Sequence, residues 1–283
     1  MHTHTILNMG VLHASWEFPA AEQNTWLTTS ICVAELWRYP VKSLAGERLQ
    51  ALTLAANGVD GDRAWGILDL RSGRILTGRR EPRLLFAASR LGTEGLPHIV
   101  LPDGRDLAGL GPATDQALSA WLEKPVTLVA AADSGAARAE YFADATDDTS
   151  RAIEWTMPRG RFVDAAAILL MTTAGLRYGA AVYSAGVWDV RRFRPNILIE
   201  LDGKGWLEDA WLGSLLRVGS AQLAPRQRCI RCTMVTRAQP GLPKDVDIYK
   251  TVHRLYDGEA GVWSEVTQPG AIAEGDAVSV LEP

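Results

Sequence analysis

Short apolar runs separated by turn-forming residues fill the first half of the chain. ICVAELW at 31–37 is apolar and strand-like, and ERLQALTLA at 47–55 partly alternates apolar and polar positions, as a half-buried strand does. RAWGILDL, RSG and RILTGR at 63–79 predict a hairpin, because a short Gly-containing turn joins two strand-like runs. ATDQALSAWLEK at 113–124 has apolar residues at helical spacing, and PVTLVAA after it predicts another strand.

The second half of the chain has the same strand-rich pattern and two helix candidates. TTAGLRYGAAV at 172–182 predicts a helix that Thr172 or Thr173 caps, and VDIYKTVHRLY at 246–256 predicts a second helix. The remaining apolar or alternating runs predict short strands at 195–201, 211–218, 220–226, 231–237, 260–266 and 276–282.

Many short strands and few helices predict a mainly β fold with a few helices (α+β), and favour β-barrels over a doubly wound sheet. Residues 131–160 are small and polar, which predicts a solvated linker or long loop. We place a domain boundary there. The expected organisation is an N-terminal extension at 1–30, a β-barrel-like domain at 31–135 and a second strand-rich β-barrel domain at 150–283.

Composition is that of an ordinary globular protein of 283 residues, 47% hydrophobic and 22% charged. The net charge of −4 gives no general attraction to nucleic acid. The longest apolar run, AAAILLM at 165–171, is far shorter than the about 20 residues of a membrane span. Residues 1–30 lack the features of a signal peptide, and three cysteines make no disulfide framework, so we expect a cytoplasmic protein.

One stretch, PRQRCIRCTMVTRAQP at 225–240, combines two cysteines with four arginines inside an acid-free segment, 210–244. Zinc would need two more ligands, and only His253 is near in sequence. A thioredoxin-like dithiol and a pair of buried structural thiols are further interpretations. In a fourth, the arginines lower the pKa of a cysteine and attract an anionic cofactor, so that the thiolate holds a soft metal.

Several motifs in order carry a resemblance to a known family. LWRYPVKSLAGERL, DGDRAWGILD and LTGRREPRL look like the β-barrel domain that precedes MOSC domains. FRPNILIE, RCIRCTMVTR and QPGAIAEGDAV look like the MOSC domain, named after the C-terminal domain of molybdenum cofactor sulfurase. The resemblance runs from about residue 31 to the C-terminus. The nearest functional relatives of this type are the mitochondrial amidoxime reducing component and its bacterial counterparts.

The resemblance implies a molybdenum cofactor (Mo-molybdopterin), a pterin dithiolene with a phosphate tail; pyridoxal phosphate is associated with such domains only at the family level. It implies that Cys232 ligates the metal and is catalytic, while Cys229 does not coordinate. The other implied cofactor contacts are Lys42, Ser43 and Arg63 at the phosphate, Arg194 and Asn196 at the pterin, and Thr172 and Thr173 after the ILL strand.

The implied activity is that of an oxidoreductase that reduces small N-hydroxylated or N-oxygenated compounds. No cysteine follows Cys232, so no appended iron–sulfur domain is expected, and electrons would come from a separate ferredoxin- or flavin-reductase-like protein. The RAQPGLPKD segment departs from the Asp-Pro turn of many relatives, which leaves the substrate open. A non-catalytic carrier of the cofactor, or of a persulfide on Cys232, needs the same cradle and is the alternative.

Overall fold

Strands dominate the structure, a computed structural model that describes residues 31–135, 137–144 and 147–281; the expected extension at 1–30 lies outside the described residues. The largest sheet has eight strands in the order β19-β15-β16-β17-β13-β14-β1-β2. Its strands are β1 (Cys32–Arg38), β2 (Glu47–Leu49), β13 (Ile168–Thr172), β14 (Ile197–Glu200), β15 (Leu215–Val218), β16 (Ala221–Ile230), β17 (Glu259–Gln268) and β19 (Val278–Leu281).

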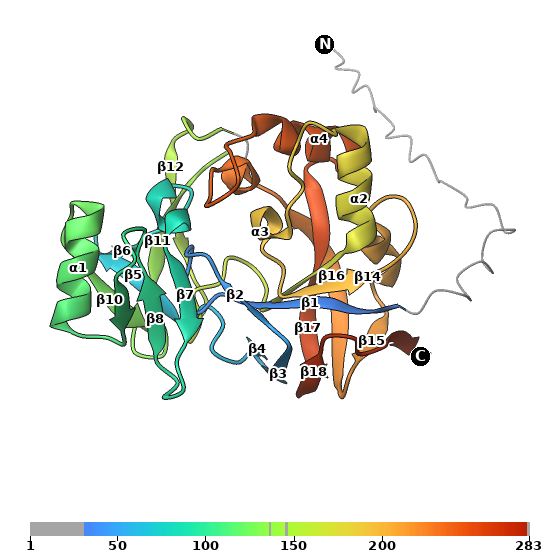
Figure 1. The fold of residues 1–283 in the computed structure, drawn as a ribbon, viewed down its shortest axis with the longest axis horizontal. Coiled ribbons are helices and arrows are strands. Elements are labelled where there is room, and N and C mark those ends of the chain that lie inside the picture. The colour runs from blue at the N-terminus through green and yellow to red at the C-terminus, as the bar shows by residue number, and fades with distance from the viewer. Residues whose placement is uncertain (1–30, 136, 145–146, 282–283) are drawn as a thin grey trace, which may run out of the picture.

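Segments far apart in the sequence meet in this sheet. β1, at the start of the described chain, pairs antiparallel with β14, where Leu36 lies opposite Ile197. β14 in turn runs parallel to β13. Figure 1 shows β1 crossing toward the part of the molecule that carries α1. The inward-facing residues of these strands are buried and form one apolar core with β15, β16 and β19, so burial of apolar surface holds the first and last described strands together.

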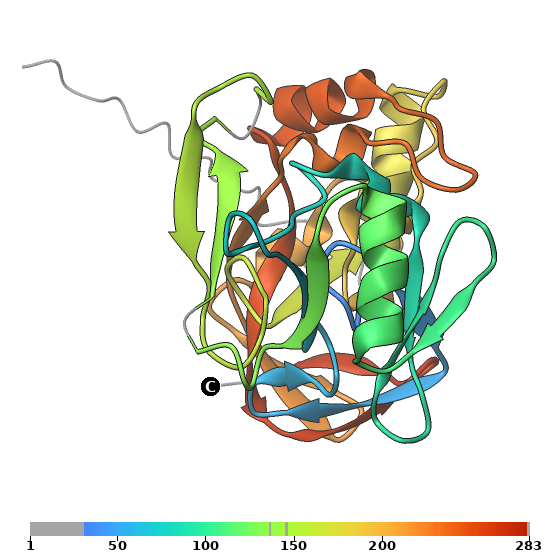
Figure 2. The ribbon, with the colours of Figure 1, turned by 90° about the vertical axis from the view of Figure 1, so that its left-hand side faces the viewer.

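Three smaller sheets complete the β structure. The five-stranded sheet has the order β10-β5-β6-β11-β12, and two three-stranded sheets have the orders β18-β3-β4 and β7-β8-β9. Figure 2 shows α1 standing in front of the part of the molecule that these N-terminal strands form. The bounds are β3 (Ala51–Ala55), β4 (Gly58–Val59), β5 (Trp65–Asp69), β6 (Arg74–Ile75), β7 (Ala88–Leu91), β8 (Pro97–Val100), β9 (Asp106–Ala108), β10 (Val126–Ala130), β11 (Arg138–Phe142), β12 (Ala152–Thr156) and β18 (Gly270–Ala273).

The described helices are short and lie against the sheets. They are α1 (Pro112–Leu122), α2 (Thr173–Val182), α3 (Val190–Phe193), α4 (Val246–Tyr256) and the 3₁₀ helices η2 (Pro82–Phe86), η3 (Leu207–Trp211) and η4 (Thr233–Thr236). In α4, Ile248 and Val252 are spaced four residues apart and are fully buried. Asp245 caps this helix, since its carboxylate accepts a hydrogen bond from the Asp247 amide. None of the described helices has the length and apolar character that crossing a bilayer requires.

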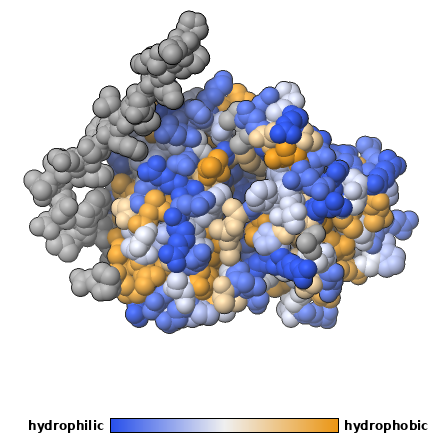
Figure 3. Space-filling model, turned by 180° about the vertical axis from the view of Figure 1, so that it is seen from behind, coloured by the Kyte–Doolittle hydropathy of each residue, from blue (hydrophilic) through white to orange (hydrophobic). Residues whose placement is uncertain are grey.

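The expected mainly β fold with a few helices is confirmed, and two local predictions are wrong. The expected loop at 131–160 contains the hairpin β11–β12, which joins the five-stranded sheet where Ala139 lies opposite Ile75. Pairing with a distant strand stabilises these strands, which a local pattern does not reveal. The expected strand at 231–237 is instead η4, a turn that buries Val235 and Thr236. From behind, the surface is mostly hydrophilic, with apolar residues in scattered patches (Figure 3).

Candidate cofactor site

A cavity of about 620 Å³ brings together residues from both halves of the chain. Its walls come from the turn after β1, the hairpin β11–β12, the segment between β12 and β13, the residues around α3 and the end of β16 with η4. Of the eight residues that the sequence nominates, six line this cavity: Lys42, Ser43, Arg63, Arg194, Asn196 and Cys232. They are separated by up to 190 residues in the sequence (232 − 42), so only the tertiary fold makes them neighbours.

The cavity wall is strongly cationic. Its lining includes one carboxylate, Asp164, and six basic side chains: Lys42, Arg63, Arg79, Arg192, Arg194 and Arg231. Lys42, Arg63 and Arg79 form ion pairs with Asp164, Asp62 and Asp148, respectively. Within the described ranges, Arg192, Arg194 and Arg231 have no carboxylate at ion-pair distance. The surplus positive charge favours an anionic ligand.

Lys42 and Ser43 lie in the turn after β1 and are almost completely buried. The Lys42 Nζ donates to the Phe162 carbonyl at 3.0 Å and pairs with Asp164. The Ser43 hydroxyl accepts a hydrogen bond from the Gly78 amide at 2.9 Å. Burial alone would raise the pKa of Asp164, but the Lys42 charge and hydrogen bond outweigh it and the pKa is lowered. Asp164 therefore stays ionised beside Lys42.

Two guanidinium groups share the ring of Tyr39. Arg63 lies 4.8 Å and Arg194 lies 4.2 Å from the ring centroid. Asp62, which is fully buried, accepts from the Tyr39 amide at 2.8 Å and pairs with Arg63, so this arrangement is held rigidly. Burial lowers the pKa of Arg194 to about 10, and its Nη2 is a buried donor with no hydrogen-bond partner in the described part of the chain.

The backbone is strained at this site. Ser43, Arg63 and Arg194 have φ angles of 68°, 48° and 57°, in the left-handed region that non-glycine residues seldom occupy. Arg194 is the C-cap of α3, and the other described non-glycine residues in this region, Glu123 and Asp257, are also helix C-caps, so this conformation is ordinary at these three positions. At Ser43 and Arg63, which cap no described helix, such strain costs of order 1–3 kcal/mol per residue. Strain of this kind concentrates at functional sites, so these two residues support a binding role for this wall.

Asn196 is fully buried and its amide is already used by the backbone of two strands. Its Oδ1 accepts from the Leu169 amide at 3.3 Å, and its Nδ2 donates to the Trp37 carbonyl at 3.3 Å. It therefore fastens β1 beside β13 and β14 at the cavity wall. Any contact with a ligand would use only the hydrogen-bonding capacity that remains.

The two cysteines of the motif both line the cavity but differ in surroundings. Cys229 is buried, and its Sγ accepts a hydrogen bond from Arg231 Nη1 at 3.0 Å. Arg231 also donates to the Phe193 carbonyl at 2.5 Å, and its Nε has no partner within the described segments. Arg231 is thus held in place with one donor free.

Cys232 is partly exposed and precedes η4. Burial raises the pKa of its thiol, although the Met234 amide and the charges of Arg231 and Arg79 act in the opposite direction. The arginines therefore lower the pKa of this thiol, as the sequence predicted, but burial outweighs them in the protein without ligand. A metal would have to displace the thiol proton.

The described residues contain no group of three or more His, Cys, Asp or Glu side chains that converges as a metal site. A metal at Cys232 would therefore need further ligands from a bound organic group. Sulfur donors suit a soft metal, and the unpaired guanidinium donors of Arg194 and Arg231 suit an anionic, acceptor-rich molecule. The residues present thus fit a pterin dithiolene with a phosphate tail.

Comparison with known families decides the classification. The MOSC N-terminal beta barrel domain matches residues 30–148, and the MOSC domain matches residues 158–279. The chain is a MOSC domain protein. The family is associated with the molybdenum cofactor, so this MOSC protein has a function related to that cofactor.

Curated relatives of this MOSC protein are distant. It is 25% identical over 232 residues to mitochondrial amidoxime reducing component 2 of Bos taurus. This alignment covers 72% of this chain and 66% of the bovine protein, just under two thirds. It is 25% identical over 286 residues to mitochondrial amidoxime-reducing component 1 of Mus musculus. This alignment covers 88% of this chain and 82% of the mouse protein.

Two solved structures are also similar. The YUAD protein from Bacillus subtilis aligns at 13% identity and a TM-score of 0.44, covering 89% of this chain and 96% of that one. YiiM from Geobacillus stearothermophilus aligns at 19% identity and a TM-score of 0.32, covering 47% of this chain and 67% of that one.

The other two nominated residues of this MOSC protein, Thr172 and Thr173, do not line the cavity. Thr172 caps α2, since its hydroxyl accepts from the Gly175 amide at 3.4 Å, and it donates to Glu208 at 2.5 Å. The Thr173 hydroxyl accepts from the Leu201 amide at 3.2 Å. The helix-capping prediction for Thr172 is confirmed, and both hydroxyls are engaged in folding contacts away from the cavity.

The structure adds cavity residues that sequence reasoning did not nominate. Arg79 lies in the quoted LTGRREPRL motif and Arg231 in the acid-free segment, so a signal existed for both. Tyr141, whose hydroxyl donates to Asp164 at 2.5 Å, comes from the supposed loop, where no pattern marked it. Burial, together with the Asp164 charge, raises the pKa of Tyr141, so its Oη keeps its proton.

The acid-free segment 210–244 is free of carboxylates along the sequence but not in space. Arg226 pairs with Glu265, and Arg228 pairs with Asp209, both supplied by other elements of the fold. Arg231 instead turns into the cavity. Clustering of basic residues along the chain therefore exaggerated the charge that actually faces the site.

Proposed function

We propose that the cavity binds a molybdenum cofactor and that the protein is an oxidoreductase that reduces N-hydroxylated or N-oxygenated compounds. The observation that carries this proposal is the convergence of Cys232 with six basic side chains around a single carboxylate. The printed names of the two curated relatives support the reaction class. Electrons would come from a separate ferredoxin- or flavin-reductase-like protein.

Each cavity residue has a stated task in this proposal. Lys42, Ser43 and Arg63 would hold the phosphate tail through charge-assisted hydrogen bonds. Because Lys42 is already paired with Asp164, whose side chain is 62% exposed, the phosphate would share Lys42 with that carboxylate or displace it. Arg194 would direct its unpaired Nη2 to the ligand, and Asn196 would keep the wall in position.

The sulfur of Cys232 would be the protein ligand of the metal, and the bound cofactor would supply two-electron redox chemistry. Reduction of an N–OH group to N–H consumes two electrons and two protons and releases one water molecule. Tyr141 Oη keeps its proton beside Asp164 at the cavity wall, so this pair would hold a proton next to a substrate bound in the cavity. Trp155 and Ile230, which are 49% and 60% exposed at the same cavity, would offer apolar surface to a substrate.

Metal and pterin analysis of the full chain tests the proposal. Protein purified from a molybdate-supplied host should contain molybdenum and an oxidisable pterin at about one equivalent per chain. Turnover of an N-hydroxylated amidine with an added electron-transfer pair should follow. Zinc at that level without pterin would end the cofactor proposal. A full complement of molybdenum and pterin without reductase turnover would overturn the enzymatic part and favour the carrier.

A further inference from the structure

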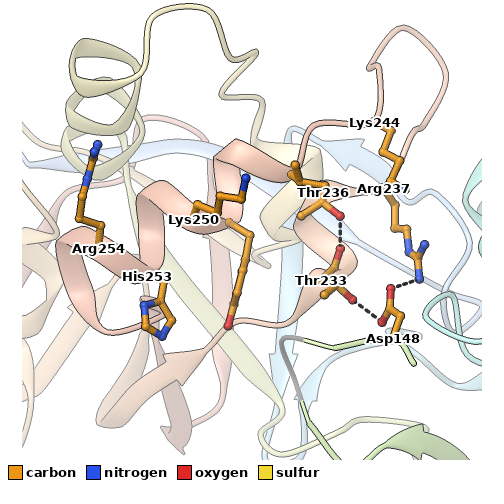
Figure 4. A pocket seen from close by; sticks show the side chains of 10 residues that line it. Asp148, Thr233, Thr236, Arg237, Lys244, Lys250, His253 and Arg254 are labelled. Atoms are coloured by element: carbon orange, nitrogen blue, oxygen red, sulfur yellow. Dashed lines mark hydrogen bonds and ion pairs between the residues drawn. The ribbon is translucent and has the colours of Figure 1, made fainter. Parts of the chain in front are cut away.

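A second concavity, of about 490 Å³, is lined in part by η4, which directly follows Cys232. Its lining comes from three segments: Asp148 before β12, η4 with Arg237, and Lys244 followed by α4. Figure 4 shows Lys250, His253 and Arg254 projecting from α4, with Thr233 and Arg237 reaching Asp148. No residue of this concavity is among those nominated for the cofactor.

The single carboxylate of this concavity has no free oxygen. Asp148 Oδ1 accepts from Arg79 Nε at 3.0 Å and from Thr233 Oγ1 at 2.7 Å, and its Oδ2 pairs with Arg237. Two guanidinium groups therefore outweigh its one negative charge. Among the described residues that line the concavity, no carboxylate is left for a cation, and Arg237 adds positive charge beside Asp148.

The other basic side chains are largely uncompensated. Lys244 and Arg254 are exposed, and neither has an ion-pair partner among the residues that the structure describes. Lys250 pairs with Asp247 three residues earlier on α4, and both side chains are more than half exposed. Exposed pairs of this kind contribute little and rearrange easily. Four basic side chains, Arg237, Lys244, Lys250 and Arg254, thus line a space in which the described residues leave no carboxylate available.

The size and floor of the space indicate the class of ligand. Small-molecule sites typically span roughly 300–1,000 Å³, so about 490 Å³ is more than a bare phosphate needs. The lining includes the exposed side chain of Val246 and the buried ring of Tyr249, and the hydroxyls of Thr233 and Thr236 add hydrogen-bonding groups. This apolar floor, together with the cations, suits an organic molecule that carries several negative charges.

We infer that this concavity is a binding site for a small organic polyanion, either a phosphate ester or a polycarboxylate. Lys244, Lys250 and Arg254 would pair with the anionic groups at the rim, and Arg237 would do so at the base. The site is separate from the proposed cofactor cavity and does not depend on the protein being a reductase. It borders that cavity, because Asp148 joins Arg237 to Arg79.

Calorimetric titration of the full chain tests this site at fixed ionic strength. The probes are citrate for the polycarboxylate source and glycerol 2-phosphate for the phosphate-ester source. At least one should bind saturably at one site per chain. The Lys244→Gln/Arg254→Gln variant should lose at least about tenfold in affinity, since charge-assisted contacts are strong. Both side chains are exposed, so the variant should fold, and its thermal unfolding is measured alongside.

The matched control is Arg138→Gln/Arg226→Gln, which removes the same charge from exposed positions outside both cavities. It should bind the probe as the unchanged protein does. Equal weakening in both double variants would overturn the site in favour of a diffuse electrostatic effect. Absence of saturable binding of either probe at millimolar concentration would also overturn it. Binding by cofactor-free protein that disappears in cofactor-loaded protein would assign the concavity to the cofactor instead.

Discussion

Glu208 gives a prediction whose size can be worked from the structure. This carboxyl is fully buried in η3, and only its Oε2 is hydrogen-bonded, by the Thr172 hydroxyl at 2.5 Å. Its Oε1 is buried without a partner among the described residues. Burial raises the pKa of Glu208 from 4.5 to about 7, although the Thr172 hydrogen bond opposes the shift. The folded protein therefore prefers the neutral carboxyl.

The sign of the pH dependence follows from this shift. Well below pH 4.5 the carboxyl is neutral in both the folded and the unfolded state, so its burial costs no ionisation energy. As pH rises toward 7 the unfolded state loses the proton first, so the free energy of unfolding falls. Each pKa unit corresponds to about 1.4 kcal/mol, so the loss approaches about 3 kcal/mol and is complete above pH 7.

Glu208→Gln isolates this contribution. The amide keeps an oxygen for Thr172 and does not titrate, and any cost of its unpaired N–H groups is the same at every pH. We expect the stability of the variant relative to the unchanged protein to rise by about 3 kcal/mol between pH 4.5 and pH 8. Urea unfolding followed by tryptophan fluorescence at four pH values measures it.

The control is Glu123→Gln, which removes a carboxylate whose side chain is 82% exposed. It corrects for the change in net charge and should show a much smaller dependence on pH. A relative gain below about 1 kcal/mol for Glu208→Gln across this range would refute the reasoning, because the raised pKa would then not exist in the folded protein.

Three further predictions concern the cavity. Cys232→Ala should abolish reductase turnover, whereas Cys229→Ala should retain much of it, because only the first would lose a metal ligand; parallel turnover and molybdenum content would show a reversed assignment if Cys229→Ala is the inactive variant. Lys42→Ala should weaken cofactor retention by on the order of 10–100-fold. Tyr141→Phe, which removes a hydrogen bond to the same Asp164 but no cation, should not, and equal retention in both variants would contradict the phosphate role of Lys42. Since burial raises the pKa of the Cys232 thiol, cofactor loading of the cofactor-free protein should strengthen as pH rises from 6 to 8; the fraction of molybdenum bound after desalting measures this, and loading that weakens with pH would argue against a thiolate ligand.

Local patterns in the sequence were sufficient for elements that local physics stabilises. The run VDIYKTVHRLY predicted α4, and a Gly-containing turn between apolar runs predicted the hairpin β5–β6. The order of the motifs also nominated Lys42, Arg63 and Cys232, which share one cavity. In these cases the prediction depends only on residues that are neighbours in the sequence, or on short motifs that match those of the family.

Long-range contacts decided the rest. The hairpin β11–β12 carries no regular pattern and exists because it adds to the edge of a sheet at β6. Thr172 looked like a cofactor contact by position, but folding directs its hydroxyl to the buried Glu208, which lies 36 residues later.

The charge and acidity of the site also came only from the fold. The acid-free segment from 210 to 244 appeared uniformly basic, yet β17 and η3 supply carboxylates to Arg226 and Arg228, and Arg231 is left facing the cavity. Burial, which no single residue type reveals, raised the pKa of Cys232 where charge alone predicted the opposite. A sequence determines which groups exist and which short elements they form; their partners and their exposure to water depend on packing between distant segments.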